Sequence, residues 1–441
     1  MLKTVKFGGS SLADAERFAN IKHIIELDPS RRIMVVSAPG KSKAYRHKIT
    51  DLLYLCNEHI KYKVDYSEFF SMIETRYRDI ANTLGIADKV DLDYEFAEIH
   101  RGIEEKRGTN YLVSRGEYLC AKLMAAYLGY DFVDASNVII FDYRGNIDFN
   151  KTNNALVNAF KASGGRIVIP GFYGSMPGGA IQLMTRGGSD VTGAIAAAAL
   201  DCDMYENWTD VAGILMADPE VVKNPLPISH ITYSQLRDMT YMGAKVLHEE
   251  TVLAVREKNI PINIRSTLDI HNPGTVISSE SEVALSGRMI TGLAGRKNYT
   301  IISVAKNHVS AEIGVIRQVV ETCEKMDIQV ENMLFGIDCF SLVVRSEQVA
   351  ANMYNFVAAM EQICGENSVK IRENISLVAA VGCRAEGSRA GIYSKMLDAL
   401  AEQDIRIRIV TQGPEEANIV IGVDDKRCDD AIRVLYRAFV G

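Results

Sequence analysis

Short runs of β-branched and aromatic residues recur through the first 290 residues of the chain. They are TVKFGGSS, RRIMVVSAPG, RIVIPGFYGS, MYENWTDVAG and PINIRST, and each ends in a cluster of glycine, serine or threonine. Apolar strands that alternate with helices are typical of a mostly parallel sheet with helices on both faces. The pattern therefore predicts an α/β fold, a three-layer α/β/α sandwich, over residues 1–285. Since the carboxyl ends of parallel strands share one edge, the polar clusters should meet there.

A charged insertion lies between Thr50 and Ser114, and its apolar residues recur at helical spacing. Its tyrosine and phenylalanine content would suit a partner surface. Helices that pack on their own domain are the preferred interpretation of the same spacing.

From about residue 299 the pattern becomes strand, helix, strand, strand, helix, strand, in YTIISVA, AEIGVIRQVVETCEKM, IQVENMLF, CFSLVVR, VAANMYNFVAAMEQIC and SVKIREN. A second set follows in ISLVAAVGC, AGIYSKMLDALAEQ, IRIRIVTQ, NIVIGV and CDDAIRVLYRAFV. Matching residues of the two sets lie 77 positions apart, as Gly314 does from Gly391 and Asp327 from Asp404. This spacing indicates an internal duplication of an α+β unit.

The second copy ends after its second helix, so its last strand is missing. A sheet left open there would expose unpaired backbone groups, which proteins avoid. We infer that RMITGLAGR, just before the first copy, supplies this strand and that the two units are interleaved. One unit then spans residues 299–374 and the other spans residues 286–298 plus 375–441.

Composition narrows the class of protein. The 441 residues, 47% hydrophobic and 24% charged, suit two or three globular domains. The net charge of −7 and the lack of long Lys or Arg runs argue against a nucleic-acid partner. The longest apolar run, residues 194–200, is far shorter than the roughly 20 residues of a membrane helix. Lys3 and Lys6 interrupt any signal-peptide core, so we expect a cytoplasmic protein with no membrane partner.

The eight cysteines form no CxxC pair, and apolar neighbours around Cys202, Cys339 and Cys383 predict reduced thiols in the core. The eight histidines never stand three or four positions apart. A dedicated zinc site is therefore not expected, and no metal is assigned to protein ligands.

The segment KFGGSS places Lys6 on a strand, before Gly8, Gly9 and Ser10. Glycines there let the backbone approach a ligand, and backbone N–H groups could hold phosphate oxygens while Lys6 reaches them from the side. A Gly-Gly turn with a purely structural role would look the same.

A second cluster, TRGGSDVTGAIAAAAL, places Ser189 and Asp190 at the start of an alanine-rich helix, where such residues also serve as caps. Arg186, just before them, could grip a carboxylate through two hydrogen bonds. Glu117 in SRGEYL stands near another helix start, where a carboxylate is also favoured by the helix dipole. One anion and one cation suit a free amino acid.

Two further segments carry candidate residues, although an ordinary turn and a solvated lysine would look the same. The two lysines, Lys6 and Lys245, together with the glycine turn suit a phosphoryl group. Asp210 lies in the turn-rich stretch WTDVAGILMADPE, and Lys245 in GAKVLH follows a glycine and an alanine. Phosphoryl transfer depends mainly on positioning and charge neutralisation. A carboxylate acceptor is already ionised at pH 7 and needs no general base, which agrees with the lack of histidine in these clusters.

These motifs together resemble the monofunctional aspartate kinases of the amino acid kinase superfamily. The resemblance covers nearly the whole chain. It rests on seven motifs in a fixed order, which are VKFGGSS, VSRGE, RGGSD, WTDVAG, the tripeptide Ala-Asp-Pro at 217–219, GAKVLH and NPGTVI. Each motif alone is modest evidence, but the ordered set is highly specific. The resemblance implies an amino acid kinase domain followed by two ferredoxin-like βαββαβ units of the ACT type.

The resemblance implies transfer of the ATP γ-phosphate, with Mg²⁺, to the side-chain carboxylate of L-aspartate. The product would be 4-phospho-L-aspartate, and the reaction the first step of lysine, threonine and methionine biosynthesis. The implied catalytic residues are Lys6, Asp190 and Lys245. The implied ATP and phosphate contacts are Gly8, Gly9, Ser10, Thr209, Asp210 and Lys245. The implied aspartate contacts are Thr50, Glu117, Phe172, Arg186, Ser189 and Asp190.

By the same resemblance, the ACT units bind lysine or threonine and lower activity, in a homodimer formed through these units or in a tetramer. Glu331 is a candidate to grip the amino groups of a lysine effector, and a solvated edge carboxylate is the alternative. The QGPEEAN loop does not decide between the two effectors.

The sequence departs from the family pattern in its nucleotide loop, where Leu215 and Glu220 replace the usual tyrosine and arginine. Glu249 replaces a common proline after KVLH. A kinase of the same fold for glutamate or a carbamate is one alternative, and a non-catalytic amino-acid sensor is another. A sensor would be expected to lose Lys6 or Asp190, and both are present. No GxGxxG follows these strands, which argues against a dehydrogenase.

Overall fold

The computed structural model describes residues 1–184, 187–244, 247, 249–279, 289–307, 313–382, 389–413 and 418–441. The chain divides into two compact units. The first comprises residues 1–214, 227–236 and 246–284, and the second comprises residues 215–226, 237–245 and 285–441.

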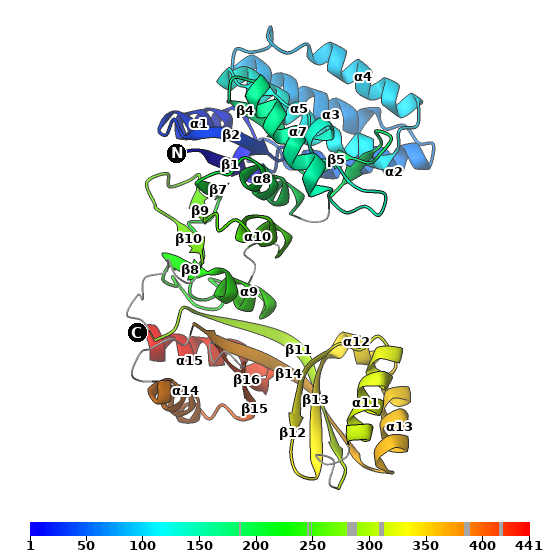
Figure 1. The fold of residues 1–441 in the computed structure, drawn as a ribbon, viewed down its shortest axis with the longest axis vertical. Helices are drawn as coiled ribbons and strands as arrows, with labels where there is room; N and C mark the ends of the chain where they lie inside the picture. The colour runs from blue at the N-terminus through cyan, green and yellow to red at the C-terminus, as the bar shows by residue number, and fades with distance from the viewer. Residues whose placement is uncertain are drawn as a thin grey trace. The chain divides into compact units, whose positions relative to one another are not determined.

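The chain up to residue 279 alternates strands with helices (Figure 1). Its strands are β1 (Lys3–Phe7), β2 (Arg31–Val36), β3 (Asp131–Phe132), β4 (Ile167–Pro170), β5 (Tyr173–Ser175), β6 (Ile181–Leu183), β7 (Met204–Thr209), β8 (His230–Thr232), β9 (Ile262–Ser266) and β10 (Thr275–Ser278). Its helices are the 3₁₀ turn η1 (Gly9–Leu12), α1 (Ala15–Glu26), α2 (Ile49–Lys61), α3 (Ser67–Thr83), α4 (Leu92–Glu104), α5 (Thr109–Leu128), α6 (Ala135–Val138), α7 (Phe149–Ala162), α8 (Gly188–Ala199), α9 (Tyr233–Tyr241) and α10 (Glu249–Arg256).

Eight of these strands form one sheet in the order β3-β4-β2-β1-β7-β9-β10-β8. All neighbours pair in parallel except β9 and β10, which are antiparallel. Strands β5 and β6 form a separate hairpin. The predicted α/β class with a mostly parallel sheet is confirmed.

Helices cover both faces of this sheet, which explains the continuous apolar runs of its central strands. Val5, Phe7 and Met34 on one face pack against α1 and the helices of the insertion, in one apolar core. Insertion residues such as Phe70 and Tyr77 belong to this core. The insertion therefore packs on its own domain, as its helical spacing predicts.

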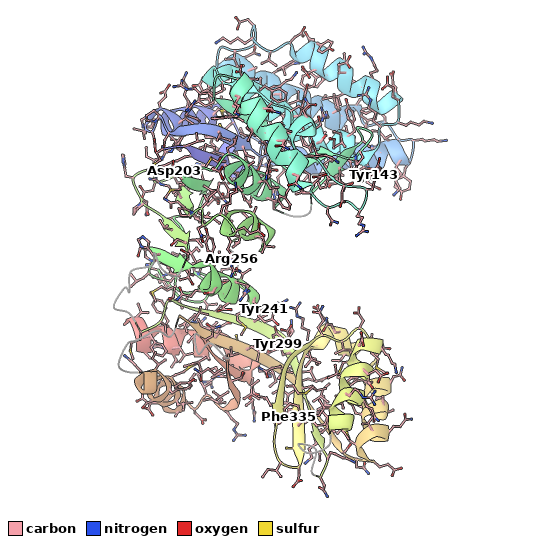
Figure 2. All side chains as sticks on the ribbon, viewed as in Figure 1. Tyr143, Asp203, Tyr241, Arg256, Tyr299 and Phe335 are labelled. Atoms are coloured by element: carbon pink, nitrogen blue, oxygen red, sulfur yellow. The ribbon has the colours of Figure 1, made fainter. Side chains whose placement is uncertain are left out.

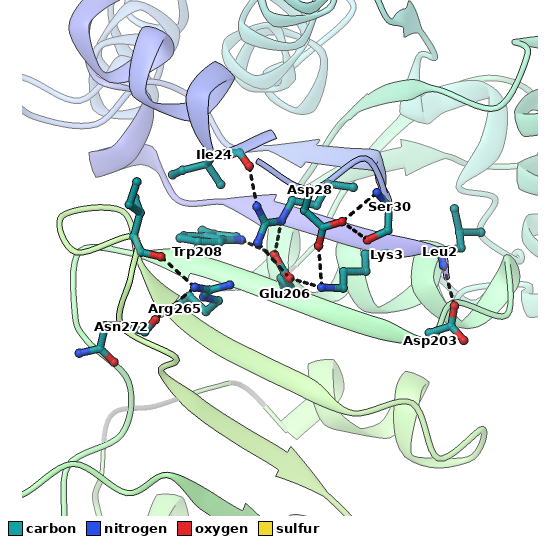
Figure 3. A network of polar contacts seen from close by, with 12 residues as sticks. Leu2, Lys3, Ile24, Asp28, Ser30, Asp203, Glu206, Trp208, Arg265 and Asn272 are labelled. Atoms are coloured by element: carbon teal, nitrogen blue, oxygen red, sulfur yellow. Dashed lines mark hydrogen bonds and ion pairs between the residues drawn. The ribbon is translucent and has the colours of Figure 1, made fainter. Parts of the chain in front are cut away.

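A buried network of charges ties the amino ends of β1 and β2 to β7 (Figure 3). Glu206 is fully buried and accepts hydrogen bonds from Arg31 Nε at 2.8 Å, Lys3 Nζ at 3.0 Å and Trp208 Nε1 at 2.8 Å. The Arg265 guanidinium lies over the Trp208 ring, 4.5 Å from its centroid. Burial alone would raise the pKa of Glu206, but the hydrogen bonds and charges of Arg31 and Lys3 outweigh burial and lower it.

Replacing Glu206 with Gln should lower the free energy of unfolding by about 3–5 kcal/mol, because Arg31 then stays buried without a countercharge. Urea denaturation at pH 7 measures this loss, with the exposed Glu26→Gln on α1 as the control. Because the folded pKa of Glu206 is lowered, its contribution is present above the unfolded pKa and is lost as the pH falls through the folded value. A loss below about 1 kcal/mol at pH 7 would contradict this role of the carboxylate.

The second unit is built on one six-stranded sheet, in the order β12-β13-β11-β14-β16-β15. Its strands are β11 (Gly292–Ala305), β12 (Val330–Phe335), β13 (Cys339–Arg345), β14 (Val369–Val381), β15 (Ile407–Gln412) and β16 (Asn418–Asp424). Its helices are α11 (Ile313–Lys325), α12 (Ser346–Ala350), α13 (Met353–Cys364), α14 (Arg389–Glu402), the 3₁₀ turn η4 (Asp425–Arg427) and α15 (Cys428–Val440).

The segment RMITGLAGR contributes its last residues to this sheet, where Gly292 to Arg296 pair with Val381 to Leu377. The sequence pattern predicts two separate strands at RMITGLAGR and YTIISVA, and two more at SVKIREN and ISLVAAVGC. The structure joins each pair into one long strand, β11 and β14. Both strands contain an asparagine with positive φ, Asn298 at 71° and Asn374 at 59°, and their pairing shifts register near these residues. A bulge therefore takes the place of the expected loop.

Most of the described cysteines follow the core prediction. Cys56, Cys120, Cys202, Cys323 and Cys428 are buried free thiols, whereas Cys364 is half-buried and Cys339 is exposed. Cys339 is the first residue of β13 and follows the turn at Gly336, so it lies at the end of the sheet. Cys383 lies outside the described residues. None of the helices that the structure describes has the length and hydropathy needed to cross a bilayer.

Candidate active site

The strand order brings four polar segments to one edge of the large sheet. Strands β4, β2, β1 and β7 are consecutive neighbours and run parallel, so their carboxyl ends lie side by side. The segments that follow them begin at Gly171, Ser37, Gly8 and Asp210. This edge is where parallel sheets of this kind bind ligands.

Lys6 and Asp190 form an ion pair at this edge. Lys6 is nearly buried on β1, and its Nζ lies 2.5 Å from Oδ1 of Asp190 in the first turn of α8. Asn207 on β7 pairs in register with Lys6 and donates a hydrogen bond from Nδ2 to the same Asp190 oxygen, at 3.0 Å. Two of the predicted catalytic residues are thus in direct contact.

The glycine turn after β1 packs tightly against the segment after β2. The Gly40 N–H donates to Gly9 O at 2.7 Å, and a Cβ added to Gly9 would lie 2.7 Å from Ala38 O. No side chain fits at Gly9 or at Gly40, so Gly9 in the GGSS motif has a structural cause. The Gly8 N–H donates to Trp208 O at 3.1 Å. Gly9 and Ser10 begin η1, where the first N–H groups precede the internal hydrogen bonds of the turn.

A buried arginine from the insertion fixes the same turns. Arg76 on α3 is 1% exposed and donates hydrogen bonds to the backbone carbonyls of Ala13, Gly40 and His47. Burial lowers the pKa of Arg76, but its guanidinium stays protonated at neutral pH and remains a cation. The sequence pattern does not single out Arg76, because its partners are backbone carbonyls that carry no residue signature.

Glu117 presents an unsatisfied oxygen. It lies in the middle of α5 and not near a helix start as the sequence suggests, so the helix dipole does not explain it. It is 4% exposed, and its Oε1 accepts a hydrogen bond from the Ala38 N–H at 3.1 Å. Its Oε2 is buried and accepts no hydrogen bond from any residue that the structure describes. Burial raises the pKa of Glu117 to about 7. A buried carboxylate oxygen without a donor is expected where a ligand supplies one.

The turn that carries Phe172 packs directly against the start of α8, which carries Ser189. Phe172 has a φ of 78°, which costs a bulky residue on the order of 1–3 kcal/mol. Its N–H donates to Thr192 Oγ1 at 3.2 Å, and its carbonyl accepts from the Met184 N–H at 2.8 Å. A Cβ on Gly171 would lie 2.6 Å from the Ser189 Cβ, so the start of α8 lies directly on this turn.

The remaining predicted residues are less closely connected. Thr209 ends β7, and its Oγ1 donates to Oδ1 of the exposed Asp210 at 3.2 Å. Thr50 is half-buried in the first turn of α2, next to Ile49, whose Cγ2 would lie 3.2 Å from a Cβ on Gly116. Arg186 and Lys245 lie outside the described residues, as does most of the QGPEEAN loop.

Glu331 lies on β12 in the second unit, and both of its oxygens have partners. Oε1 accepts from Arg345 Nε at 2.7 Å, and Oε2 accepts from the Tyr241 hydroxyl. The neighbouring Tyr299 hydroxyl is buried, and burial raises its pKa. Figure 2 labels Tyr299 and Tyr241. The pKa of Arg345 is raised, mainly by its hydrogen bond to Glu331. Glu331 is therefore no freely solvated edge carboxylate.

Family models match most of the chain. Residues 1–266 match the model of the amino acid kinase family, and residues 378–439 match a model of the ACT domain. Within the parts of the chain that the structure describes, no cluster of three or more His, Cys, Asp or Glu side chains could hold a metal ion.

Relatives match over the whole length. Aspartokinase 3 of Bacillus subtilis is 31% identical, and the match covers 99% of this chain and 98% of the relative. The crystal structure of an aspartate kinase from Clostridium acetobutylicum is 39% identical, with a TM-score of 0.89 and 99% of both chains covered. Aspartokinase III of E. coli, solved in complex with aspartate and ADP, has the same fold at 22% identity, with a TM-score of 0.74 and all of both chains covered. The chain therefore belongs to the amino acid kinase family, and within that family to the aspartate kinases.

Proposed function

We propose that this chain transfers the γ-phosphoryl group of ATP to the side-chain carboxylate of L-aspartate, giving 4-phospho-L-aspartate and ADP. The observation that carries this proposal is the nearly buried ammonium of Lys6, paired with Asp190 beside the glycine turn after β1. A cation at this position stabilises negative charge on the phosphoryl group during its transfer. The acceptor carboxylate is ionised at neutral pH, so the chain needs no general base.

The roles of the other residues follow from their places at the sheet edge. The Gly8 N–H already donates to Trp208 O, so the N–H groups of Gly9 and Ser10 are the proposed phosphate donors. Glu117 supplies an anion for the ammonium group of aspartate, and Arg186 a cation for its α-carboxylate. Thr50, Phe172 and Ser189 are proposed to line the same site, Thr209 and Asp210 to contact the nucleotide, and Lys245 to act with Lys6.

Mg²⁺ is proposed to enter with the nucleotide. The ion typically keeps most of its waters and binds phosphate oxygens with only one or two carboxylates. Asp210, which is exposed directly after β7, could supply such a carboxylate, and a cage of protein ligands is not required. When bound, the ion would neutralise charge on the phosphate oxygens.

A coupled assay with ATP, Mg²⁺ and L-aspartate tests the proposal. We expect ADP release that depends on L-aspartate, together with an acyl phosphate that hydroxylamine traps. L-Glutamate and carbamate, offered under the same conditions, should give little or no turnover. Turnover on either of these acceptors and not on aspartate would overturn the proposed substrate.

Regulation through the second unit is also part of the proposal. The two ACT units, over residues 299–374 and over 286–298 plus 375–441, are proposed to bind lysine or threonine in a homodimer or a tetramer. Because Glu331 is already bonded to Arg345 and Tyr241, an effector's ammonium group would have to compete with both. The cytoplasmic location stays a prediction from the sequence.

Replacing Glu331 with Gln should raise the lysine concentration needed for half-inhibition by about 10-fold or more, because a neutral amide attracts an ammonium group less strongly. The activity without effector should stay within about twofold of the wild-type value. Inhibition curves with lysine and with threonine measure this, and the exposed Glu347→Gln on α12 is the matched control. An unchanged lysine response would reject Glu331 as an effector contact.

A further inference from the structure

Asn207 is a buried polar residue on β7 that none of the recognised motifs assigns to the site. Only 4% of it is exposed, and its neighbours Tyr205 and Trp208 are also buried. The parallel register places it directly beside Lys6 on β1 and beside Ile264 on β9. A buried amide on a central strand needs a hydrogen-bonding partner, and the partner of Asn207 is Asp190.

Strand β7 holds Asp190 at two points. Asn207 Nδ2 donates to Asp190 Oδ1 at 3.0 Å, and the Tyr205 hydroxyl donates to the backbone carbonyl of Asp190 at 3.0 Å. Lys6 Nζ approaches the same Oδ1 at 2.5 Å. One carboxylate oxygen is thus shared between a cation that can move on a long side chain and an amide on a short one.

This sharing has a consequence for phosphoryl transfer. On the proposed function, the Lys6 ammonium must turn its N–H groups toward phosphoryl oxygens, which weakens its pair with Asp190. Without the Asn207 amide, the partly buried Asp190 carboxylate would then have no side-chain donor left among the described residues. An unpaired carboxylate there is costly, and it would follow the lysine or compete for it. With the Asn207 amide still bonded, Asp190 keeps a donor and keeps its place.

We propose that Asn207 is a positioning residue for the kinase reaction: it anchors the Asp190 carboxylate so that Lys6 can serve the phosphoryl group. The proposal rests on the proposed function, because it assigns Lys6 to the phosphoryl group. Asn207 itself touches neither substrate nor nucleotide in this scheme. The charged groups facing it from the neighbouring elements are Lys6 from β1 and Asp190 from α8.

Two substitutions distinguish positioning from simple stabilisation. Asn207→Leu removes the donor at similar size, and it should lower kcat about 10-fold with both KM values within about threefold of the wild type. Asn207→Asp places a second carboxyl group beside Asp190, and at pH 8 it should lower kcat about 100-fold. Two close carboxylates share a proton at lower pH, and the protonated group can then donate to Asp190 as the amide does. The activity of N207D relative to the wild type should therefore rise several-fold between pH 8 and pH 6, whereas the relative activity of N207L should stay flat.

The control is Asn263→Leu, which removes a buried amide on β9 that, within the described parts of the chain, makes no hydrogen bond with Asp190. It should leave kcat and its pH profile unchanged. Wild-type kcat in N207L, or an N207D activity ratio equal at both pH values, would overturn the positioning role. So would failure of both Asn207 variants to fold while the control folds, because Asn207 would then be structural. If the wild-type chain itself shows no aspartate-dependent turnover, the proposed function has failed instead.

Discussion

Replacing Lys6 with Met is expected to lower kcat by about 10³-fold or more while the protein stays folded. The loss corresponds to about 4 kcal/mol of transition-state stabilisation. Lys6 is nearly buried on a central strand, and a Cβ on Gly8 would lie 3.7 Å from its Nζ, so the cation lies beside the glycine turn. Methionine fills nearly the same volume without the charge, and Asp190 keeps its hydrogen bond from Asn207. The effect should therefore appear in turnover and not in folding.

Steady-state kinetics and thermal unfolding of the same preparation test this expectation. Lys161→Met, which removes an exposed lysine from α7, controls for the loss of one positive charge. We expect K161M to match the wild type in kcat and in its melting temperature. If K6M kept more than about a tenth of the wild-type kcat, Lys6 could not be the cation that stabilises the transferred group.

Strand order explains only one half of the contact between Lys6 and Asp190. Lys6 lies near the carboxyl end of β1, where parallel strands bring polar segments together. Asp190 lies in the first turn of α8, which follows the separate β5–β6 hairpin, so the fold supplies its position. Asn207 could not be recognised in the same way. It lies inside an apolar strand, where an amide has meaning only through a partner that the fold supplies. Arg76 could not be recognised from the sequence for a similar reason, since its partners are three backbone carbonyls in two distant turns.

The strands of the second unit could be predicted from the sequence only in part. The 77-residue offset between Gly314 and Gly391 reveals a duplicated motif, and an edge left unpaired calls for the strand before the first copy. The joining of the predicted strands into β11 and β14 could not be predicted in this way. It depends on Asn298 and Asn374 adopting positive φ inside a strand, which asparagine tolerates but does not require. A turn and a bulge have similar local sequences, and only the pairing with the neighbouring strand separates them.

Replacing Glu117 with Gln is expected to raise the KM for aspartate about 10- to 100-fold at pH 8 and to remove the pH dependence of that KM. Burial raises the pKa of Glu117 to about 7, and its Oε2 has no donor among the described residues. An ammonium group bound there would favour the ionised carboxylate, so binding below pH 7 must release a proton. In the wild type, the KM for aspartate should therefore fall as the pH rises through 7. An exposed glutamate on α4, changed in Glu104→Gln, is the control.

The same carboxyl group should affect stability with the opposite trend. Its folded pKa of about 7 lies above the reference value of 4.5, so between these values the folded chain keeps a proton that the unfolded chain has lost. The free energy of unfolding should then decrease by about 3 kcal/mol as the pH rises from 4.5 to above 7. E117Q should lack this decrease and should be the more stable protein at pH 8 without substrate. Urea denaturation at pH 5 and pH 8 measures both proteins, and equal slopes with pH would mean that Glu117 ionises freely in the folded chain. Glu117 is thus expected to lower the stability of the ligand-free protein and to increase its affinity for aspartate. This combination is expected at a binding site, because the ammonium group of aspartate supplies the countercharge that the protein itself does not.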